Sequence, residues 1–473
     1  MERKTKIVCT IGPASNQAEI ISRLIDAGMD VARLNFSHGT WAEHSEVIRM
    51  VRALAEQKRR PVAILQDLQG PKIRLGLFER GSAIIRPGDQ FTLTRRDVPG
   101  NEKIASVTYD RLATEVKPGD QILIDDGMIE LQVLKTDGVE VECTVLRGGI
   151  LKDHKGLNLP GVALSVPAVT EKDLHDLEFG IEHRVDYIAL SFVRTRRDIV
   201  RIKELLRERG ADIPIIAKLE RPKAVRNLDG ILEVADGVMI ARGDLGVELP
   251  LEEIPLLQKQ IIQKANQRGV TVITATQMLE SMIEHARPTR AEVSDVANAI
   301  LDGTDAVMLS GETASGAYPV EAVRVMAQVA VEAERGLQPR SPFVHDPEGA
   351  SSFPDAISEA ACRAAVETRA KAIVAFTQTG STARLISRFR PQTPVIAFAP
   401  DERVRRRLCL YWGVVPKVMA PTAHIDEMLA RIDEALLVGV CAQKGDVVVI
   451  VSGAPIGVKG RTNLMTLHRV GEG

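Results

Sequence analysis

Eight short apolar runs, each ending in polar or turn-forming residues, recur along the first two thirds of the chain. Most are followed by a stretch with apolar residues at helical spacing, such as 18–27 and 256–267. Strands that alternate with helices favour a parallel sheet, and eight such units predict a closed (β/α)8 TIM barrel of the α/β class. The predicted strands are 6–11, 31–35, 62–67, 187–192, 214–220, 237–242, 271–276 and 306–310.

Charged and polar side chains stand at or just after the ends of six of these strands. They are Arg33, Asn35, Asp67, Lys218, Glu220, Asp244, Thr276 and Ser310. The carboxyl ends of the strands form the active-site face of a TIM barrel. The sequence therefore predicts that six separate segments converge on one site.

A segment of different character, 70–168, interrupts the pattern between the third and fourth strands. The turn sequences RPGD (86–89) and KPGD (117–120) precede strand-like runs at 90–94 and 121–124, and no long helical period is present. We expect an inserted all-β domain that acts as a lid over the site, with 1–69 and 169–340 forming the catalytic barrel. A β-domain without a catalytic role is the alternative.

A third domain, 341–473, is predicted after a Pro-, Gly- and Ser-rich linker at 336–354. Helical runs alternate with strand runs at 371–376, 394–399 and 446–451, which favours an open, doubly wound α/β domain. Its first strand leads into the loop TQTGST (377–382), where backbone amides and hydroxyls suit a phosphate. Such residues also cap helices without a ligand. A second loop at 452–457, after a neighbouring strand, favours the phosphate.

The composition fits a large enzyme of the cytoplasm with about three domains. The 473 residues carry a formal net charge of −2, so no global charge favours nucleic acid or membrane as a partner. The arginine-rich run 402–407 is accordingly predicted to be a solvated helix face. No signal-peptide core opens the chain, and the apolar run 435–442 is far shorter than the ~18 residues of a membrane span. Five dispersed cysteines predict reduced thiols.

Glu220 and Asp244 offer hard oxygen ligands at neighbouring strand ends, suited to Mg²⁺ or Mn²⁺. A pair of salt-bridged carboxylates is the alternative. Lys218 lies two positions before Glu220, so both side chains share one face of the strand. It would neutralise charge that develops on oxygen, or simply pair with Glu220. Arg33 and Arg74 are candidates to clamp a phosphate through the forked guanidinium.

Five segments resemble the pyruvate kinase family: KTKIVCTIGPAS (4–15), ARLNFSHG (32–39), ARGDLG (241–246), ATQMLESM (275–282) and MLSGETA (308–314). The resemblance extends from near residue 4 to the end, and it is to the bacterial, short form without an additional carboxyl-terminal domain. It implies that phosphoenolpyruvate gives its phosphoryl group to ADP, which yields ATP and pyruvate in the last step of glycolysis.

The resemblance also implies roles for single residues. Glu220 and Asp244 would hold the divalent metal, and backbone amides around Gly243 and Asp244 would hold the substrate carboxylate with Thr276. Arg33 and Lys218 would stabilise the transferring phosphoryl group. Thr276 and Ser310 would belong to the route that protonates the methylene carbon, with water or a neighbour as the acid. The residues that would meet the nucleotide are Asn35, His38, Arg74 and Lys155.

Many pyruvate kinases need K⁺, and the positions of the family's potassium ligands remain at Asn35, Ser37 and Asp67. The glutamate that those enzymes carry nearby is here Lys72. Three further positions match the variant that the family associates with potassium independence, namely Leu68, Gln69 and Leu75. A tethered ammonium can replace the charge of the monovalent cation, so we expect activity without K⁺.

The terminal domain resembles the family's effector domain, in which a sugar phosphate or a nucleotide such as AMP shifts a homotetramer between states. The effector phosphate would contact Thr377, Thr379, Gly380, Ser381 and Thr382. Two other functions stay open at this point. One is a metal-dependent aldolase or lyase on the same barrel, and the other is a catalytically idle sensor of phosphorylated ligands.

Overall fold

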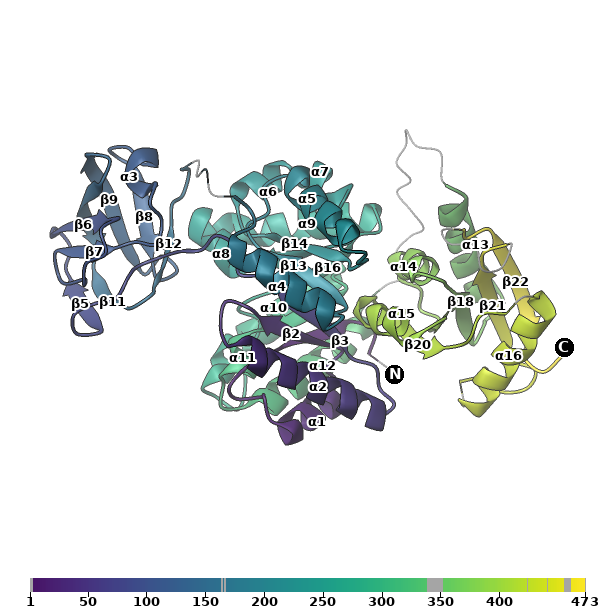
Figure 1. Ribbon diagram of the computed structural model, residues 1–473. Coiled ribbons are helices and arrows are strands. Elements are labelled where there is room, and N and C mark those ends of the chain that lie inside the picture. The colour runs from purple at the N-terminus through teal and green to yellow at the C-terminus, as the bar shows by residue number, and fades with distance from the viewer. Residues whose placement is uncertain are drawn as a thin grey trace.

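A computed structural model describes residues 3–162, 165, 167–337, 352–422, 424–439, 441–454 and 461–472. Three bodies lie in a row, with the inserted β-domain at one end, the barrel in the middle and the terminal α/β domain at the other end (Figure 1). Most of the predicted linker 336–354, and residues 455–457 of the second predicted loop, lie outside the described residues.

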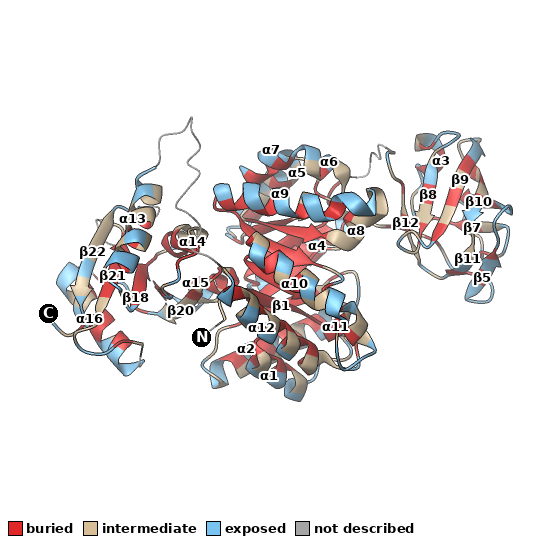
Figure 2. Cartoon of the chain, turned by 180° about the vertical axis from the view of Figure 1, so that it is seen from behind, coloured by how far each residue is buried: buried red, intermediate tan, exposed pale blue. Residues whose placement is uncertain are grey.

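The central body is a closed barrel of eight parallel strands, as predicted. Each predicted run is a strand, with ends that differ by at most two residues. Parallel strands covered on both faces read as continuous apolar runs, and the barrel strands are almost entirely buried (Figure 2). They are β1 (Lys6–Ile11), β2 (Val31–Asn35), β3 (Ala63–Asp67), β13 (Tyr187–Leu190), β14 (Ile215–Leu219), β15 (Gly237–Ala241), β16 (Thr271–Ala275) and β17 (Ala306–Leu309).

Helices surround this barrel. The longer ones are α1 (Ala18–Ala27), α2 (Trp41–Gln57), α4 (Glu171–Glu182), α5 (Arg196–Glu208), α9 (Ile254–Gln267), α10 (Arg290–Asp302) and α12 (Pro319–Arg335). Capping boxes at Thr40, Thr170 and Thr289 start α2, α4 and α10, because each hydroxyl accepts from an amide that the first turn leaves unpaired. Three short helices follow strands at the carboxyl end of the barrel, and these are α6 (Pro222–Arg226), α8 (Arg242–Glu248) and α11 (Gly311–Ala314). A further short helix, α7 (Leu228–Leu232), comes after α6.

An aspartate stands one residue before every second barrel strand and caps the strand next to it. The carboxylates of Asp30, Asp186, Asp236 and Asp305 accept hydrogen bonds of 2.7–2.9 Å from the amides of Ile7, Ile64, Ile215 and Val272. Each carboxylate also pairs with a cation, and these are Arg3, Arg406, Lys203 and Arg390. Two of the four cations, Arg390 and Arg406, belong to the terminal domain, which therefore docks on the amino end of the barrel. We did not predict this repeat.

The inserted domain is all-β with its own buried core. One sheet has the order β4-β12-β8-β9-β10-β6-β7, and β11 pairs with β5. The turns at Gly88 and Gly119 have φ of +90° and +94°, which glycine adopts without strain, and they precede the predicted strands β6 and β8. The strands are β4 (Ile73–Arg74), β5 (Ser82–Ile85), β6 (Gln90–Thr94), β7 (Ile104–Ser106), β8 (Gln121–Ile124), β9 (Ile129–Thr136), β10 (Glu140–Arg147), β11 (Gly149–Lys152) and β12 (Gly156–Asn158), with one helical turn, α3 (Leu112–Glu115).

The terminal domain is an open sheet with the order β20-β19-β18-β21-β22 and a buried core on each face, as a doubly wound domain requires. Its strands are β18 (Ala372–Phe376), β19 (Val395–Ala399), β20 (Val414–Val418), β21 (Val447–Ser452) and β22 (Leu464–Arg469). Its helices are α13 (Phe353–Glu367), α14 (Ser381–Arg388), α15 (Glu402–Arg407) and α16 (Ile425–Val438).

Sequence reasoning missed the two edge strands of this sheet. Pro416 interrupts the apolar run of β20, and proline is tolerated in a strand only at an edge. The outer strand β22 is partly exposed along its length and pairs antiparallel with β21, so its pattern carries little burial signal.

The prediction for 402–407 was wrong in part, because α15 packs against the barrel. Arg407 is buried and Arg406 pairs with Asp186 at 2.9 Å, although Arg403 is solvated. All five cysteines are free thiols. None of the helices in the described ranges is long and apolar enough to cross a membrane.

Candidate active site

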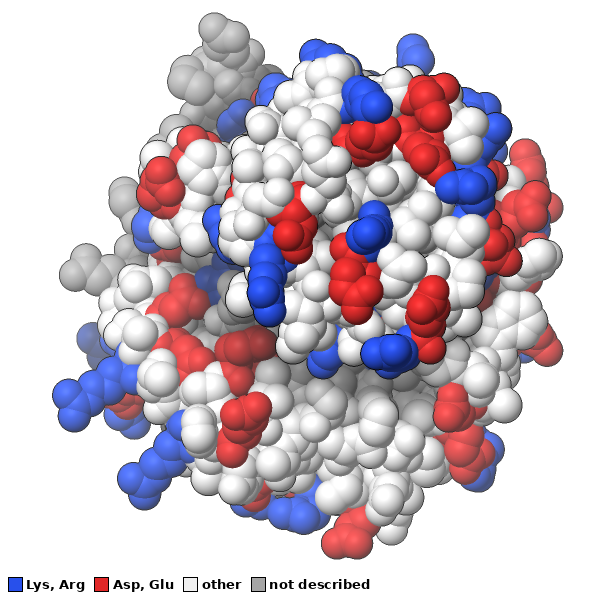
Figure 3. Space-filling model, turned by 90° about the vertical axis from the view of Figure 1, so that its left-hand side faces the viewer, with Lys and Arg blue, Asp and Glu red and all other residues white. Residues whose placement is uncertain are grey.

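A cleft of about 710 Å³ separates the inserted domain from the carboxyl end of the barrel. Lys72 lines it from the inserted segment, and Gly243, Asp244, Thr276 and Ser310 line it from three different strand ends. Acidic and basic side chains are interspersed over the face of the molecule that the inserted domain presents (Figure 3).

Four charged side chains, Arg33, Asp67, Lys218 and Glu220, form a continuous network of ion pairs across three barrel strands, here called the charged network. Asp67, which is 1% exposed, accepts from Arg33 Nε at 2.8 Å and lies 3.2 Å from Lys218 Nζ. Lys218 Nζ also lies 2.8 Å from Glu220 Oε1. Burial opposes the charge of Lys218, but the carboxylates of Asp67 and Glu220 raise the pKa of its ammonium. Lys218 is thus held as a cation, suited to neutralise negative charge rather than to accept a proton.

Two residues that we did not predict to belong to the site, Ser191 and Phe192, hold the charged network in position. Ser191 Oγ accepts from Lys218 Nζ at 2.9 Å and donates to the carbonyl of Leu68 at 2.7 Å. The Phe192 amide donates to Glu220 Oε2 at 2.7 Å, with Phe192 at a φ of +55°. A bulky residue in this left-handed region is strained and is retained where the surroundings require it. The signal was available, since both residues close the fourth predicted strand.

Thr276 and Gly243 are linked across neighbouring strands. The Gly243 amide donates to Thr276 Oγ1 at 2.8 Å. Thr276 and the following Gln277 have φ of +67° and +55°, and Arg242 donates to the carbonyl of Thr276 at 2.8 Å. The strained turn therefore directs the threonine hydroxyl and the first turn of α8 to one point.

Ser310 lies at the end of β17 with a free hydroxyl. Its amide donates to Glu312 Oε2 at 2.7 Å, and its Oγ is buried and has no hydrogen-bond partner among the described residues. Glu312 also accepts from the Leu279 amide at 3.0 Å, and burial raises the pKa of its carboxyl. Glu312 is a further residue that sequence reasoning missed, and its role is to connect the turns after β16 and β17.

The predicted nucleotide residues lie on the inserted domain and on the loop after β2. Gly156 pairs with Arg74 in the sheet, so Lys155 lies beside Arg74. Lys155 Nζ is 2.7 Å from Asp125 Oδ1, and Arg74 donates to the carbonyl of His154 at 3.0 Å. Burial, and then the charges of Arg74, Lys72 and Arg33, lower the pKa of His38. His38 is therefore a neutral side chain among cations.

The positions of the family's potassium ligands include Asn35 and Ser37, close in sequence to His38. Asn35 Oδ1 accepts from the Ser37 amide at 3.1 Å, and Leu68 is buried. Lys72 packs against Gly156, where an added Cβ would lie 2.8 Å from Lys72 Cε. Within the described part of the chain the Lys72 ammonium makes no ion pair, so its charge is directed to the cleft.

Glu220 and Asp244 fit a divalent cation by their chemistry. Burial and the carboxylate of Glu220 raise the pKa of Asp244 to about 6, against the charges of Lys218 and Lys72. A cation between two such oxygens relieves their repulsion. The described residues contain no group of three or more His, Cys, Asp or Glu that could hold a metal by themselves. Remaining ligands would then come from substrate and water.

The predicted effector loop closes on itself. Thr377 Oγ1 accepts from the Gly380 amide at 2.9 Å, Thr379 Oγ1 lies 3.2 Å from Ser381 Oγ, and Thr382 Oγ1 lies 2.9 Å from Thr462 Oγ1. Gly380 has a φ of +95° and starts α14. The N-cap residue Gly380 offers no side-chain hydrogen bond to the first turn of α14, and Thr379 is the exposed hydroxyl of the loop.

The fold and these contacts define a TIM barrel that gathers two carboxylates and a lysine–arginine pair at the carboxyl ends of its strands. Two family descriptions match the chain, "Pyruvate kinase, barrel domain" over residues 2–323 and "Pyruvate kinase, alpha/beta domain" over residues 355–468. The chain therefore belongs to the pyruvate kinase family, and its activity is that of a pyruvate kinase.

Individual relatives agree over the full length. The chain is 45% identical to the pyruvate kinase of Clostridium perfringens, with 99% of this chain and 100% of the relative covered. It is 47% identical to the pyruvate kinase of Corynebacterium glutamicum, with 100% and 98% covered. The crystal structure of a pyruvate kinase from Cryptosporidium parvum superposes with a TM-score of 0.90 at 38% identity, covering 99% of this chain and 96% of that chain.

Proposed function

We propose that the charged network, which runs from Arg33 through Asp67 and Lys218 to Glu220, is the phosphoryl-transfer machinery of this enzyme. This charged network is the single observation that carries the proposal, because it fixes two cations and the Glu220 carboxylate beside Asp244. Phosphoryl transfer depends on positioning and on neutralising charge rather than on a protein nucleophile. Arg33 and Lys218 stabilise the phosphoryl group as it moves from phosphoenolpyruvate to ADP.

Glu220 and Asp244 hold the divalent cation, Mg²⁺ or Mn²⁺. When bound, this cation supplies positive charge to the substrate carboxylate and to the enolate oxygen. The amides of Gly243 and Asp244, at the first turn of α8, bind the substrate carboxylate together with the Thr276 hydroxyl. The bond from the Gly243 amide to Thr276 Oγ1 supports this arrangement.

Thr276 and Ser310 form the route that protonates the methylene carbon of the enolate. Neither hydroxyl is acidic enough alone, so water between them delivers the proton. The buried Ser310 Oγ, which has no hydrogen-bond partner among the residues that the structure describes, supports this role, since a buried hydroxyl without a partner is costly unless it serves the reaction.

Arg74, Lys155, His38 and Asn35 meet the nucleotide from the inserted domain and the β2 loop. Closure of the inserted domain (residues 70–168) onto the barrel (1–69 and 169–340) completes the site and excludes water. The cleft that both domains line supports this inference.

The enzyme works without K⁺, because the Lys72 ammonium supplies the missing charge beside Asn35, Ser37 and Asp67. A phosphorylated effector, either a sugar phosphate or AMP, binds at loop 377–382 of the terminal domain (341–473), with Thr379 and Ser381 as outward donors. The assembly is a homotetramer. These inferences extend the resemblance to this chain. The first of them is supported by Lys72, which makes no ion pair with any described residue.

The test measures pyruvate formation from phosphoenolpyruvate and ADP with Mg²⁺, first in a buffer free of K⁺ and then after K⁺ is added. We expect the wild type to be fully active in both buffers. Lys72→Glu should lose most of its activity without K⁺ and regain it when K⁺ is added. Lys117→Glu, an exposed lysine of the same domain, is the matched control and should behave as the wild type. Wild-type turnover that requires K⁺ would keep the enzyme and refute the role of Lys72.

A further inference from the structure

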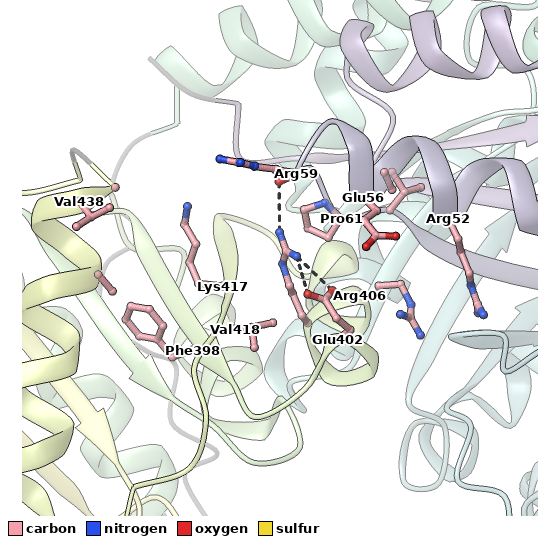
Figure 4. Close-up of a pocket in the computed structure, with 15 residues that line it drawn as sticks. Arg52, Glu56, Arg59, Pro61, Phe398, Glu402, Arg406, Lys417, Val418 and Val438 are labelled. Carbon is pink, nitrogen blue, oxygen red and sulfur yellow. Dashed lines mark hydrogen bonds and ion pairs between the residues drawn. The ribbon is translucent and has the colours of Figure 1, made fainter.

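A second cleft, of about 820 Å³, lies where the terminal domain meets the barrel. The barrel contributes the end of α2 and the loop that leads to β3. The terminal domain contributes α15, β19, β20 and the end of α16 (Figure 4). None of the residues that line it belongs to the active site or to loop 377–382.

Cations outnumber carboxylates along its walls. The charged lining residues are Glu56, Glu402, Arg52, Arg59, Arg405, Arg406 and Lys417. Two of the cations are satisfied, since Arg406 pairs with Asp186 and Arg405 lies 2.9 Å from Glu402. The other three make no ion pair in the described part of the chain. The cleft therefore carries an excess of positive charge among the described residues.

Arg52, on α2, is one of the three cleft cations that make no ion pair among the described residues. Its terminal nitrogen donates to the carbonyl of Arg184 at 2.6 Å, and its Nε is buried and has no acceptor among the described residues. Burial, together with the charges of Arg406 and Arg184, lowers the pKa of Arg52, although Asp186 opposes this. An anion in the cleft would remove this repulsion.

Arg59 and Lys417 project into the cleft from the two domains. Arg59 has a φ of +54° and follows α2, and Lys417 stands on the edge strand β20. In Figure 4 the two side chains extend toward the same opening, one from each wall. Two cations that face one opening from different domains are arranged to share one anionic group.

The rest of the wall is apolar. Val418 lies beside Lys417, Phe398 pairs with Lys417 in the sheet, and Val438 and Pro61 close the sides. Binding sites for small organic molecules typically have volumes of roughly 300–1,000 Å³, with mostly apolar walls and a few polar groups. The cleft has this character, and its polar groups are basic.

We propose that this cleft binds a small organic anion, with its carboxylate or phosphate held between Arg59 and Lys417 and its apolar body on the exposed side chains of Val418 and Val438. The ligand would contact both domains, so it would stabilise their docked arrangement. This site is separate from the phosphoryl-transfer site, and the inference does not rest on the roles proposed there.

The test is calorimetric titration of the full-length protein with phenyl phosphate, which combines an anionic group with a flat apolar body. We compare the wild type with Lys417→Gln and Arg59→Gln. The matched control is Arg403→Gln, which removes an exposed cation of α15 outside the cleft. A charged hydrogen bond contributes about 1.5–3 kcal/mol, so each cleft variant should weaken binding by roughly tenfold or more and the control should not.

Two further measurements keep the outcome decisive. Val418→Glu places a carboxylate on the exposed edge strand and should abolish the same binding heat while the thermal midpoint stays unchanged. Inorganic phosphate, which lacks the apolar body, should bind at least about tenfold more weakly than phenyl phosphate. Equal binding of phenyl phosphate by the wild type and all cleft variants would overturn the site. If inorganic phosphate bound as tightly as phenyl phosphate, the inference that the ligand carries an apolar organic body would be wrong.

Discussion

The two ends of the barrel both bury charged side chains, and they use them differently. At the amino end each aspartate of the repeat has one backbone amide and one cation as partners, as Asp305 has Val272 and Arg390. At the carboxyl end Asp67 is shared by Arg33 and Lys218, and Lys218 is shared again by Glu220. Ion pairs between one aspartate and one cation stabilise the fold. In the charged network the two central ions, Asp67 and Lys218, are shared between partners, which leaves charge available to a substrate.

The comparison also separates how strain is used. Residues in the left-handed region at the carboxyl end, Phe192 and Thr276, direct hydrogen bonds toward the site. At the amino end none of the four aspartates has a positive φ. Variants at matched positions of the two ends should therefore separate activity from stability.

The largest effect is expected for Lys218→Gln. Losing a preorganised charge at the reacting group lowers kcat by roughly 10²–10³-fold. The matched variant is Lys203→Gln, which removes the cation of an amino-end pair with Asp236. It should leave kcat unchanged. Pyruvate formation under saturating substrates measures both, and an equal loss in the two variants would refute the distinction between the ends.

Asp305→Ala should instead lower stability. The change leaves Arg390, whose side chain is 8% exposed, without its carboxylate, and it removes the cap of β16. Breaking a buried ion pair costs about 3 kcal/mol or more. Calorimetry should show a clear drop in the unfolding temperature, with kcat of the folded enzyme retained below it. An unchanged unfolding temperature is the result that contradicts this.

Thr276→Val tests the hydroxyl at the carboxyl end. The valine is similar in shape but leaves the Gly243 amide without its acceptor at 2.8 Å. A donor left without a partner in this partly buried position costs about 2 kcal/mol, so kcat/KM should fall roughly thirtyfold. Thr276→Ser keeps the oxygen and should recover most of the activity. If the serine variant is as impaired as the valine variant, the hydroxyl is not the important group.

Asp236→Ala should have the smallest effect. Its carboxylate caps β14 in the same way as Asp305 caps β16, but its side chain is 40% exposed. A solvated pair and one amide bond contribute about 1 kcal/mol together. The unfolding temperature should therefore fall less than in Asp305→Ala. The opposite order would show that burial does not set the strength of the repeat.

Part of this organisation could be read from the sequence. Strands buried on both faces are continuous apolar runs, so all eight barrel strands, and polar side chains at six strand ends, were evident without coordinates. Glycine turns before β6 and β8 gave the character of the inserted domain. Edge strands β20 and β22 escaped because their residues are half exposed and β20 contains Pro416.

Other features depend on which strands become neighbours. Ser191 and Phe192 read as the end of an apolar strand, and only the closed barrel brings them to Lys218 and Glu220. The aspartate repeat is visible in the chain as Asp30, Asp186, Asp236 and Asp305, but uneven spacing hides it. Its meaning arises from the amide on the adjacent strand.

The sequence by itself determined the kinds of element, the order of the domains and the identity of the charged groups at the strand ends. These follow from local periodicity and residue chemistry, which act over a few neighbouring positions. Only the tertiary structure decided which charged side chains share partners in a network and which form single ion pairs. Pairing energies depend on distance and burial between residues far apart in the chain, such as Arg406 and Asp186, and these are set when the barrel closes and the terminal domain docks.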